Sequence, residues 1–410
     1  NDQANMTGLR QTFRSLLSAP AFTAIVIVTL AIAIGANSAI FSVLNGVVLK
    51  PLPYDAPDQL IMVWEANPAQ SLPQEPTSAA TFVDWREQAT SFQEMAAFRY
   101  RGFTLTLDGG VPQRIASAEV TPSLFRVLRT EPALGRTFTA DEEAPGNERL
   151  VILSDGAWRT RLGADADIIG RTIPLDGVAH EVVGVMPPGF TFPIGDTEVE
   201  AWSPLTLSLD NLASRPHRGL STIGRLGDAS TLEGARSEMS LIAGQIAEDY
   251  PDSNQGWTVT LVSAEEQLVG DTTSTIWILF GAVTLVLLIG CVNVANLLLV
   301  RSGDRNREMA VHAAFGARAT DLVKRAMSEG LVLGVFGGLA GLVVAWLLVS
   351  VLRSVLPVGF PRLEDVRLDP IVLGFTAIVS LVAAVLFSLA PALRSVRPDI
   401  SSILQGSARG

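Results

Sequence analysis

The sequence predicts an α-helical membrane protein with four transmembrane helices and a mixed α/β extracytoplasmic domain inserted between helices 1 and 2. The 410 residues are 48% hydrophobic and 17% charged, with a mean hydropathy of +0.35. Ordinary soluble domains carry about 25% charged residues, so this chain is too apolar for a single soluble fold. The apolar residues are concentrated in four stretches without Asp, Glu, Lys or Arg, namely 21–49, 272–300, 330–352 and 370–393. Each is longer than the roughly 20 residues that cross a bilayer.

The spacing of these stretches defines the domain organisation. About 220 residues separate the first stretch from the second, which is enough for one or two compact domains. We therefore expect these segments in order: a cytoplasmic amphipathic helix (1–20), transmembrane helix 1 (21–49), an external α/β domain (50–274), transmembrane helix 2 (275–300), a cytoplasmic loop (301–329), transmembrane helix 3 (330–352), a short outer loop (353–369), transmembrane helix 4 (370–393) and a cytoplasmic tail (394–410).

The segment before the first stretch carries an apolar stripe with helical spacing. Its residues recur at i, i+4, i+7 and i+8 beside Arg10 and Arg14, and they are Leu9, Phe13, Leu16 and Leu17. This pattern is typical of an interfacial amphipathic helix, and a plain extension of the first span is the alternative. The first apolar stretch is longer than the roughly 7–15 residues of a signal peptide core, so we expect a retained helix.

The distribution of basic residues predicts the orientation in the membrane. The N-terminal flank, the 301–329 loop and the C-terminal tail together carry 11 Lys and Arg residues. The outer loop carries only three, which are offset by three acidic residues. Because cytoplasmic loops are enriched in Lys and Arg, we expect both termini in the cytoplasm and the large domain outside, in the periplasm of a Gram-negative cell.

The net charge of −11 divides between two compartments. Residues 50–274 contain 16 basic and 32 acidic side chains, a net charge of −16, so the remainder of the chain is basic. The acidic residues are scattered along the domain, which indicates a solubility feature rather than a cation site. An acidic chain lacks the basic face that neutralises phosphates, and we expect no nucleic-acid partner.

Local patterns predict alternating strands and helices in the external domain. Asp176-Gly177 between apolar runs predicts a two-residue hairpin turn. Ser-Thr-Leu-Glu at 230–233 predicts a capping box that opens a helix ending at Pro251, and a strand follows it, so this region forms a βαβ-type unit. Other helices are expected over 81–88, 91–97 and 154–162, and strands over 60–65, 114–120, 149–153, 171–175, 179–186, 221–226 and 257–262.

The sequence contains no evident catalytic or metal-binding constellation. It has neither a G-x-S-x-G nucleophile motif nor an H-E-x-x-H zinc motif. The single Cys291 excludes an intramolecular disulfide, and the three His residues are far apart. Asp141, Glu142 and Glu143 are adjacent and cannot all face one ion, so we expect a solvated turn. We therefore predict no catalytic residue, no metal site and no enzymatic activity in this chain.

The lysine residues exclude an ATPase of the Walker type. The chain has only Lys50 and Lys324, which follow Leu49 and Val323, whereas a P-loop requires glycine directly before its lysine. We expect no cofactor in this chain. If the protein takes part in ATP-driven work, a partner subunit must bind the ATP and Mg.

Polar and small residues inside the apolar stretches predict helix packing. Asn293 and Asn296 share one helix face, so we expect interhelical hydrogen bonds, with a substrate path as the alternative. No ionisable residue lies within the four stretches, which disfavours a proton- or ion-coupled transporter. Close approach of helix backbones is expected at the glycines of the third stretch, Gly334, Gly337, Gly338 and Gly341.

Five segments carry a family resemblance that covers nearly the whole chain. They are 22–45 (FTAIVIVTLAIAIGANSAIFSVLN), 52–54 (LPY), 285–300 (LVLLIGCVNVANLLLV), 307–318 (REMAVHAAFGAR) and 389–399 (LAPALRSVRPD). They resemble the macrolide-exporter type of ABC transporter permease, the MacB/FtsX-like superfamily, and within it the first repeat of the acidobacterial duplicated permeases. Those permeases carry this unit twice, so the chain is either half of a longer protein or a single repeat that dimerises.

The resemblance implies a mechanism and a set of partners. Such permeases pair with a cytoplasmic ABC ATPase, two copies of the four-helix unit form the membrane core, and ATP-driven motion is relayed to a MacB-like periplasmic core domain for efflux from the periplasm. The implied location is the inner membrane, with a periplasmic adaptor as a further partner. The residues implied to form or support the ATPase-coupling element are Arg307, Glu308, Phe315, Gly316, Ala317 and Arg318. The alternative is that the basic residues of this loop only fix the topology.

Two other functions compete with the transport hypothesis. The first is an FtsX-like signalling or scaffold protein that regulates a periplasmic enzyme, as cell-division members of the superfamily do. The large external domain disfavours it. The second is a membrane-anchored periplasmic enzyme, which would require a catalytic constellation and would not need three helices after its domain.

Overall fold

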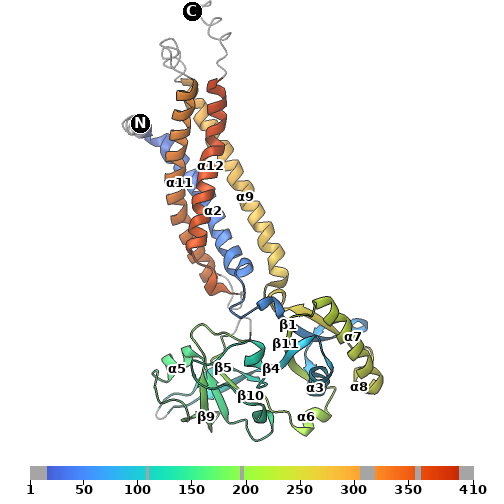
Figure 1. Cartoon of the computed structure of the whole chain (residues 1–410). Helices are drawn as coiled ribbons and strands as arrows, with labels where there is room; N and C mark the ends of the chain where they lie inside the picture. The colour runs from blue at the N-terminus through green and yellow to red at the C-terminus, as the bar shows by residue number, and fades with distance from the viewer. Residues whose placement is uncertain (1–15, 108–109, 194–197, 305–318, 356–361, 397–410) are drawn as a thin grey trace, which may run out of the picture. The chain divides into compact units, whose positions relative to one another are not determined.

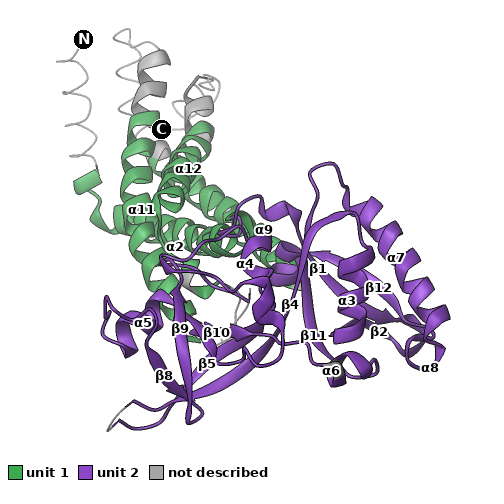
Figure 2. Ribbon diagram, turned by 60° about the horizontal axis from the view of Figure 1, so that its bottom comes forward, with its two compact units in different colours: residues 1–50, 271–410 green, residues 51–270 purple. Residues whose placement is uncertain are grey.

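The computed structural model describes residues 16–107, 110–193, 198–304, 319–355 and 362–396 (Figure 1). The chain divides into two compact units, coloured separately in Figure 2. The helical unit consists of residues 1–50 and 271–410, and the α/β unit consists of residues 51–270. The α/β unit is thus inserted between the first and second long apolar helices, in the order that the sequence predicts.

The helical unit contains long helices rich in apolar residues. They are α2 (Pro20–Leu44), α9 (Ala264–Asp304), α11 (Ala319–Val355) and α12 (Pro370–Val396). The π-helical turn η1 (Asn45–Leu49) continues α2, and the short turn η5 (Leu363–Asp365) precedes α12. Four segments are long and apolar enough to cross a membrane, namely Pro20–Leu49, Thr272–Arg301, Met327–Val355 and Pro370–Leu389.

Three of these helices, α2, α11 and α12, pack directly on one another. Their common core is apolar, and Leu30, Ile34, Leu333 and Phe387 are fully buried in it. α9 contributes Val294 to the same core. Helices that associate within a bilayer gain little from the hydrophobic effect, so in a bilayer this core would stabilise the unit chiefly through close van der Waals packing.

The α/β unit is built on a 12-stranded mixed sheet, whose main path has the order β12-β1-β11-β4-β5-β10-β7-β9-β6. Most neighbouring strands are antiparallel, whereas β10 with β5 and β7 with β9 are parallel. The strands are β1 (Leu60–Asn67), β2 (Leu72–Glu75), β3 (Thr77–Ser78), β4 (Phe92–Leu105), β5 (Gln113–Val120), β6 (Leu134–Gly135), β7 (Leu150–Leu153), β8 (Thr172–Leu175), β9 (Val178–Val185), β10 (Ala201–Pro204), β11 (Arg218–Leu226) and β12 (Thr258–Ser263).

Short helices flank the sheet, and side chains cap several of them. Ser78, Ser154 and Thr231 each accept a hydrogen bond from the backbone N–H three residues further on. The predicted capping box at 230–233 is therefore wrong, because Thr231 rather than Ser230 caps α7, and the residue three positions further on is Gly234 rather than a glutamate. The helical elements are η2 (Pro57–Gln59), η3 (Pro68–Gln70), α3 (Ala79–Gln88), α4 (Leu124–Val127), η4 (Ala140–Glu143), α5 (Asp155–Arg161), α6 (Leu209–Ala213), α7 (Leu232–Asp249) and α8 (Pro251–Asn254).

The sheet buries a different core on each face. Ile61 and Val63 of β1 belong to the cluster that contains side chains of α3 and α7, whereas Leu60 and Met62 belong to a second cluster. This alternation is the period of two that a strand imposes on its side chains. The predicted βαβ-type unit is confirmed, since α7 connects the parallel strands β11 and β12, and β1 lies between them.

One predicted helix is a strand. The helix expected over 91–97 is wrong, because β4 runs through this segment at the centre of the sheet. Glu94, Met95 and Ala96 favour a helix by intrinsic propensity. In the folded chain, however, Met95 is buried in one core and Ala96 in the other. Burial on both faces of the sheet therefore outweighs the local preference.

The predicted hairpin turn is confirmed. β8 and β9 pair antiparallel up to Leu175 and Val178, and Asp176 and Gly177 between them have φ values of +50° and +75°. A type I′ turn requires positive φ at both central residues, which is why Asp-Gly favours it. Asp176 Oδ1 also accepts a 2.8 Å hydrogen bond from Thr104 N–H, which ties the turn to β4.

Candidate coupling site

The residues implied to couple the chain to an ATPase lie outside the described residues. Arg307, Glu308, Phe315, Gly316, Ala317 and Arg318 all fall within 305–318, and most of the amphipathic helix expected over 1–20 falls within 1–15. α11 follows this loop directly. The candidate site therefore consists of the helices next to this loop and those packed on them, because a force applied to the loop would be transmitted to these helices.

The first pair of predicted packing glycines faces α12. A Cβ atom at Gly334 would lie 2.7 Å from Ala384 Cβ, and one at Gly338 would lie 2.3 Å from Ser380 Oγ. Real Cβ atoms essentially never approach other atoms within 3.0 Å. Only glycine therefore allows the backbones of α11 and α12 to come this close.

The second pair of glycines faces α2. A Cβ atom at Gly337 would lie 2.7 Å from Leu30 Cβ, and one at Gly341 would lie 3.1 Å from Ile34 Cγ2. α2 contributes a glycine of its own to this contact. A Cβ atom at Gly35 would lie 2.7 Å from Val344 Cβ. α11 is thus the central helix, with one glycine edge for each neighbour.

α9 is attached to α2 by hydrogen bonds of one asparagine. Asn37 is 1% exposed, its Nδ2 donates a 2.7 Å hydrogen bond to Val283 O, and its Oδ1 accepts one of 3.2 Å from Thr284 Oγ1. In the sequence, Asn37 is a polar residue within the first apolar stretch, and no pattern points to its partners. Its partners are 246 and 247 positions away, and sequence reasoning missed them.

Asn293 and Asn296 lie on the exposed face of α9 within this unit. Neither residue therefore makes the expected interhelical hydrogen bond at a buried position within the described part of the chain. α9 is also the least covered of the apolar segments, with 17% of its most apolar window buried, compared with 39% to 50% for the other three. The helical unit leaves one face of α9 open to an outside partner or to lipid.

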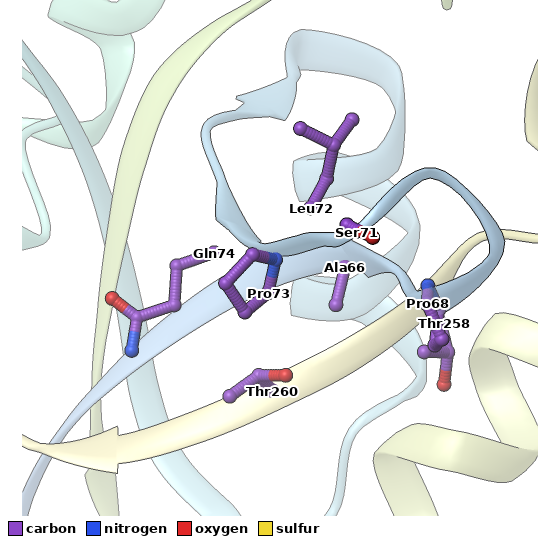
Figure 3. A pocket seen from close by; sticks show the side chains of 8 residues that line it. All are labelled: Ala66, Pro68, Ser71, Leu72, Pro73, Gln74, Thr258 and Thr260. Atoms are coloured by element: carbon purple, nitrogen blue, oxygen red, sulfur yellow. The ribbon is translucent and has the colours of Figure 1, made fainter.

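The α/β unit has a groove of about 440 Å³ beside β1 and β12 (Figure 3). Ala66, Thr258 and Thr260 come from these two strands, and the chain from Ser71 to Gln74 runs along the opposite side. None of the described residues that line it is charged. This lining suits contact with an uncharged surface rather than acid–base chemistry.

A buried ion pair ties the strands near this groove together. Glu65 of β1 is 1% exposed and pairs with Arg218 of β11. Burial raises the pKa of the Glu65 carboxyl, and the charge and hydrogen bond of Arg218 oppose this rise. The guanidinium carbon of Arg218 also lies 3.7 Å from the ring centroid of Trp257. The pair therefore holds β1 and β11 together. Among the described residues, no group of His, Cys, Asp or Glu is placed to hold a metal.

The acidic run at 141–143 does not converge on one point. Glu142 pairs with Arg136 and accepts a 2.8 Å hydrogen bond from Thr139 N–H, whereas Glu143 pairs with Arg86 of α3. The two carboxylates hold the turn η4 to different parts of the unit. They do not share one ion, as expected, but both are ion-paired and half-buried rather than solvated.

Comparison with known families decides what these two units are. The MacB-like periplasmic core domain family matches residues 23–242, more than half of the chain, and the FtsX-like permease C-terminal family matches residues 280–400. The chain belongs to the MacB/FtsX-like permease family. The first match covers α2 and most of the α/β unit, and the second covers α11, α12 and most of α9. The closer resemblance to the acidobacterial duplicated permeases stays a prediction.

Curated relatives in this family are longer proteins. The macrolide export ATP-binding/permease protein MacB of Azoarcus sp. is 26% identical over 332 residues, which cover 79% of this chain and 48% of the relative. The pyoverdine export ATP-binding/permease protein PvdT of Pseudomonas syringae pv. tomato is 24% identical over 278 residues, which cover 67% of this chain and 40% of the relative. The chain thus spans about half the length of these relatives, or less.

Solved structures of similar domains give weaker matches. The periplasmic region of MacB from Actinobacillus actinomycetemcomitans covers 57% of this chain and 99% of that one, with 14% identity and a TM-score of 0.39. The extracellular domain of the ABC-type transporter YknZ from Gram-positive bacteria covers 49% and 99%, with 14% identity and a TM-score of 0.36.

Proposed function

We propose that this chain is the permease subunit of an ABC transport system. In this proposal it relays the ATP-driven motion of a separate cytoplasmic ATPase to its α/β unit, and the work exports or extrudes a substrate from the periplasm. The observation that carries the proposal is the family membership of both parts of the chain. These residues contain no P-loop lysine, so in this proposal an ATPase outside them binds the ATP and Mg.

The proposed location is the inner membrane, with both termini in the cytoplasm and the α/β unit in the periplasm. Four segments have the length and hydropathy of transmembrane helices. The concentration of Lys and Arg in the flanks and in the 301–329 loop supports the orientation.

The ATPase is proposed to contact the 301–329 loop, with Arg307, Glu308, Phe315, Gly316, Ala317 and Arg318 as the coupling element. This loop is the longest of the three segments assigned to the cytoplasm, which are 1–20, 301–329 and 394–410. It leads into α11, whose glycines hold both α2 and α12. A displacement of α11 would therefore move these three helices together.

A second permease copy is the proposed partner of the open face of α9. Asn293 and Asn296 on this face would be costly in lipid without hydrogen-bond partners, and a facing helix would supply them. A periplasmic adaptor is a further proposed partner of the α/β unit.

Co-purification tests the proposal directly. The full chain is co-expressed with a candidate P-loop ABC ATPase from the same genome, extracted in detergent, reconstituted in nanodiscs and assayed for ATP hydrolysis. We expect a stable complex whose hydrolysis rate differs from that of the ATPase alone. Arg307→Glu with Arg318→Glu should weaken this complex, and Arg353→Glu, in the last turn of α11 at the end assigned to the outside, is the charge control. Absence of any complex for the unmodified chain would contradict the proposal.

The alternative is an FtsX-like signalling protein that regulates a periplasmic enzyme without transport. The match of the FtsX-like family to residues 280–400 favours it. The two functions differ in the phenotype of a deletion strain. Altered cell-wall hydrolysis with unchanged efflux would support signalling, and accumulation of an efflux substrate with normal cell-wall hydrolysis would support transport.

A further inference from the structure

A second cavity lies in the α/β unit, near the opposite end of the sheet from the groove beside β12. Its volume is about 310 Å³, at the lower end of the range for small-molecule sites. It is formed by the last residues of α5, the turn after that helix, the β8 residues Thr172 to Pro174, and Leu107. Figure 2 shows α5, β8 and β9 together at this end of the unit. The cavity is therefore enclosed within one compact unit.

The wall that β8 contributes to this cavity is an open strand edge. Val182 N–H of β9 donates a 2.8 Å hydrogen bond to Arg171 O, whereas Glu181 N–H points to the other side and donates one of 2.8 Å to Arg149 O. Thr172 is the residue of β8 that pairs with Glu181. Because paired residues of antiparallel strands alternate in the direction of their backbone groups, the N–H and C=O of Thr172 point away from β9.

The end of β4 covers only the further part of the same edge. Leu105 pairs with Leu175, and Thr106 N–H donates a 3.3 Å hydrogen bond to Pro174 O. In the described part of the chain, no backbone group bonds to the outward N–H or C=O of Thr172, and this residue is exposed. The cavity wall thus offers one backbone donor and one acceptor, to which an extended peptide can add.

Arg171, the neighbour of Thr172, has guanidinium nitrogens that are not used. Its Nη1 is paired with Asp165, whose other oxygen accepts a 3.0 Å hydrogen bond from Asp167 N–H. Its Nε and Nη2 have no partner among the residues that the structure describes, and the side chain is 62% exposed. A guanidinium presents its donors in a planar fork that fits a carboxylate. The cavity can therefore accept one further carboxylate at Arg171.

The other arginine of the cavity is already compensated. Arg161 is paired with Glu200, with a 2.8 Å hydrogen bond from Nη2, and its Nη1 donates a hydrogen bond to Gln113. Asp165 is the only acidic residue among the described residues that line the cavity, and both of its oxygens are bonded. A ligand therefore meets no unpaired carboxylate here, which favours an anion although the α/β unit as a whole is acidic.

The rest of the cavity wall is apolar. Ile168 and Ile173 are buried members of a core cluster, and Leu162 packs against the same cluster. Leu107 also lines the cavity, although its side chain is exposed. A ligand with an apolar chain would remove these side chains from water, which is the general driving force for binding in such a cavity.

We propose that this cavity binds a short apolar chain that ends in a carboxylate. The carboxylate pairs with Nε and Nη2 of Arg171, and the apolar chain lies against Leu162, Ile168 and Ile173. The C-terminus of a peptide and a fatty acid both have this chemistry. The edge of β8 distinguishes them, because only a peptide has amide groups that bond to Thr172. This site needs neither the ATPase nor the relay of motion.

Ligand-observed NMR on the full chain in nanodiscs tests the site, with empty nanodiscs as the blank. The two probes are hexanoate and N-acetyl-leucyl-valine, which has a carboxylate and two amides. We expect both to bind saturably, and the peptide about tenfold more tightly because of its hydrogen bonds to the strand edge. Hexanamide and the C-terminal amide of the peptide lack the charge and should bind at least about tenfold more weakly than the acids.

A matched pair of arginine variants tests the carboxylate position. Arg171→Gln removes the charge from an exposed side chain and should raise the Kd of both probes about tenfold or more. Arg159→Gln is the control, because Arg159 is an exposed, ion-paired residue of α5 that does not line the cavity. It should leave both Kd values unchanged. An unchanged Kd in Arg171→Gln would overturn the proposal.

A second pair of variants tests the strand edge. Thr172→Pro removes the outward N–H without breaking a hydrogen bond to β9, so it should weaken binding of the peptide several-fold and leave hexanoate unchanged. Thr172→Val keeps the N–H and should bind both probes like the unmodified chain. Equal affinities of the two probes, with no effect of Thr172→Pro, would support the carboxylate site and assign it to a fatty acid.

Two results with the unmodified chain would overturn the proposal. One is the absence of saturable binding of either acid up to about 10 mM. The other is equal binding of the acids and their amides. Neither result bears on the proposed function, because association with the ATPase is measured in a separate experiment.

Discussion

The three helices α2, α11 and α12 differ from α9 in how they are held. The first three approach one another at Gly334, Gly337, Gly338 and Gly341, where no side chain fits between the backbones. α9 is attached to α2 by hydrogen bonds to Asn37 and has only 17% of its most apolar window buried. The difference indicates a rigid three-helix body and a fourth helix with room for an outside partner.

The largest expected effect comes from filling the α11–α2 contact. Gly337→Leu should destabilise the helical unit by more than about 3 kcal/mol, because even a Cβ atom there would lie 2.7 Å from Leu30 Cβ. Thermal unfolding in detergent measures the loss. Gly374→Leu adds the same side chain where a Cβ atom meets nothing within 4 Å, so it should unfold like the unmodified chain. Equal losses in both variants would contradict a rigid body built on glycine contacts.

Acid should lower the stability of the α/β unit, through Glu238, without the same effect on the helical unit. Burial raises the pKa of the Glu238 carboxyl, but hydrogen bonds from Ser91 and Thr90 outweigh it and lower the pKa from 4.5 to about 2. A lowered carboxyl pKa stabilises the fold above pH 4.5, and this contribution is lost as the pH falls from about 4.5 to 2. Glu238→Gln should cost about 1.5–3 kcal/mol at pH 7 and flatten that acid dependence.

The control for this prediction is the helical unit itself. Denaturation followed separately in the two units, by hydrogen exchange at β4 and at α11, should show the acid dependence of Glu238 only in β4. Parallel loss of protection in α11 would mean that the two units unfold together.

A smaller effect is expected from releasing α9. Asn37→Leu removes the hydrogen bonds to Val283 O and Thr284 Oγ1 and should cost about 1–2 kcal/mol. Hydrogen exchange along α9 should rise, while α11 stays protected. Thr284→Val removes only one of the two bonds and should give the smaller change, and a double-mutant cycle should show coupling. Full additivity of the two substitutions would count against the hydrogen-bonded attachment.

The smallest effect on stability is expected at the open face of α9. Asn293→Leu with Asn296→Leu should leave the melting temperature of the isolated chain nearly unchanged, since both residues are exposed. Association of two chains in nanodiscs should weaken about 3- to 30-fold if a second copy pairs with this face. Ile278→Leu and Ile289→Val alter equally exposed positions on the same helix and are the controls.

The parts of the fold that local patterns control were predicted from the sequence. The long apolar stretches, the Asp176-Gly177 hairpin and the helix between β11 and β12 each depend on residues close in the chain. The segment 91–97 was not predicted correctly, because its strand forms only when both faces of the sheet are buried. That condition involves residues from distant parts of the chain.

The candidate site shows the same limit. The glycines of α11 were predicted as packing residues, but a glycine pattern does not state which helix each glycine meets. The pairs Asn37 with Val283 and Lys50 with Asp365 are 246 and 315 residues apart. No periodicity connects them, so only the folded chain brings them together. Arg307 to Arg318, implied by the family resemblance, lie outside the described residues, and their role stays a prediction.

Lys50, which pairs with Asp365 beside the end of α2, is one of only two lysines in the chain. Its side chain is 43% exposed while the ammonium is paired with Asp365, so an amine-reactive reagent would react with it more readily whenever the pair opens. Proteolytic peptides would distinguish its modification from that of Lys324. The protein thus carries a natural chemical probe, and the rate at which one amine is acylated in intact cells would report how often the Lys50–Asp365 ion pair opens.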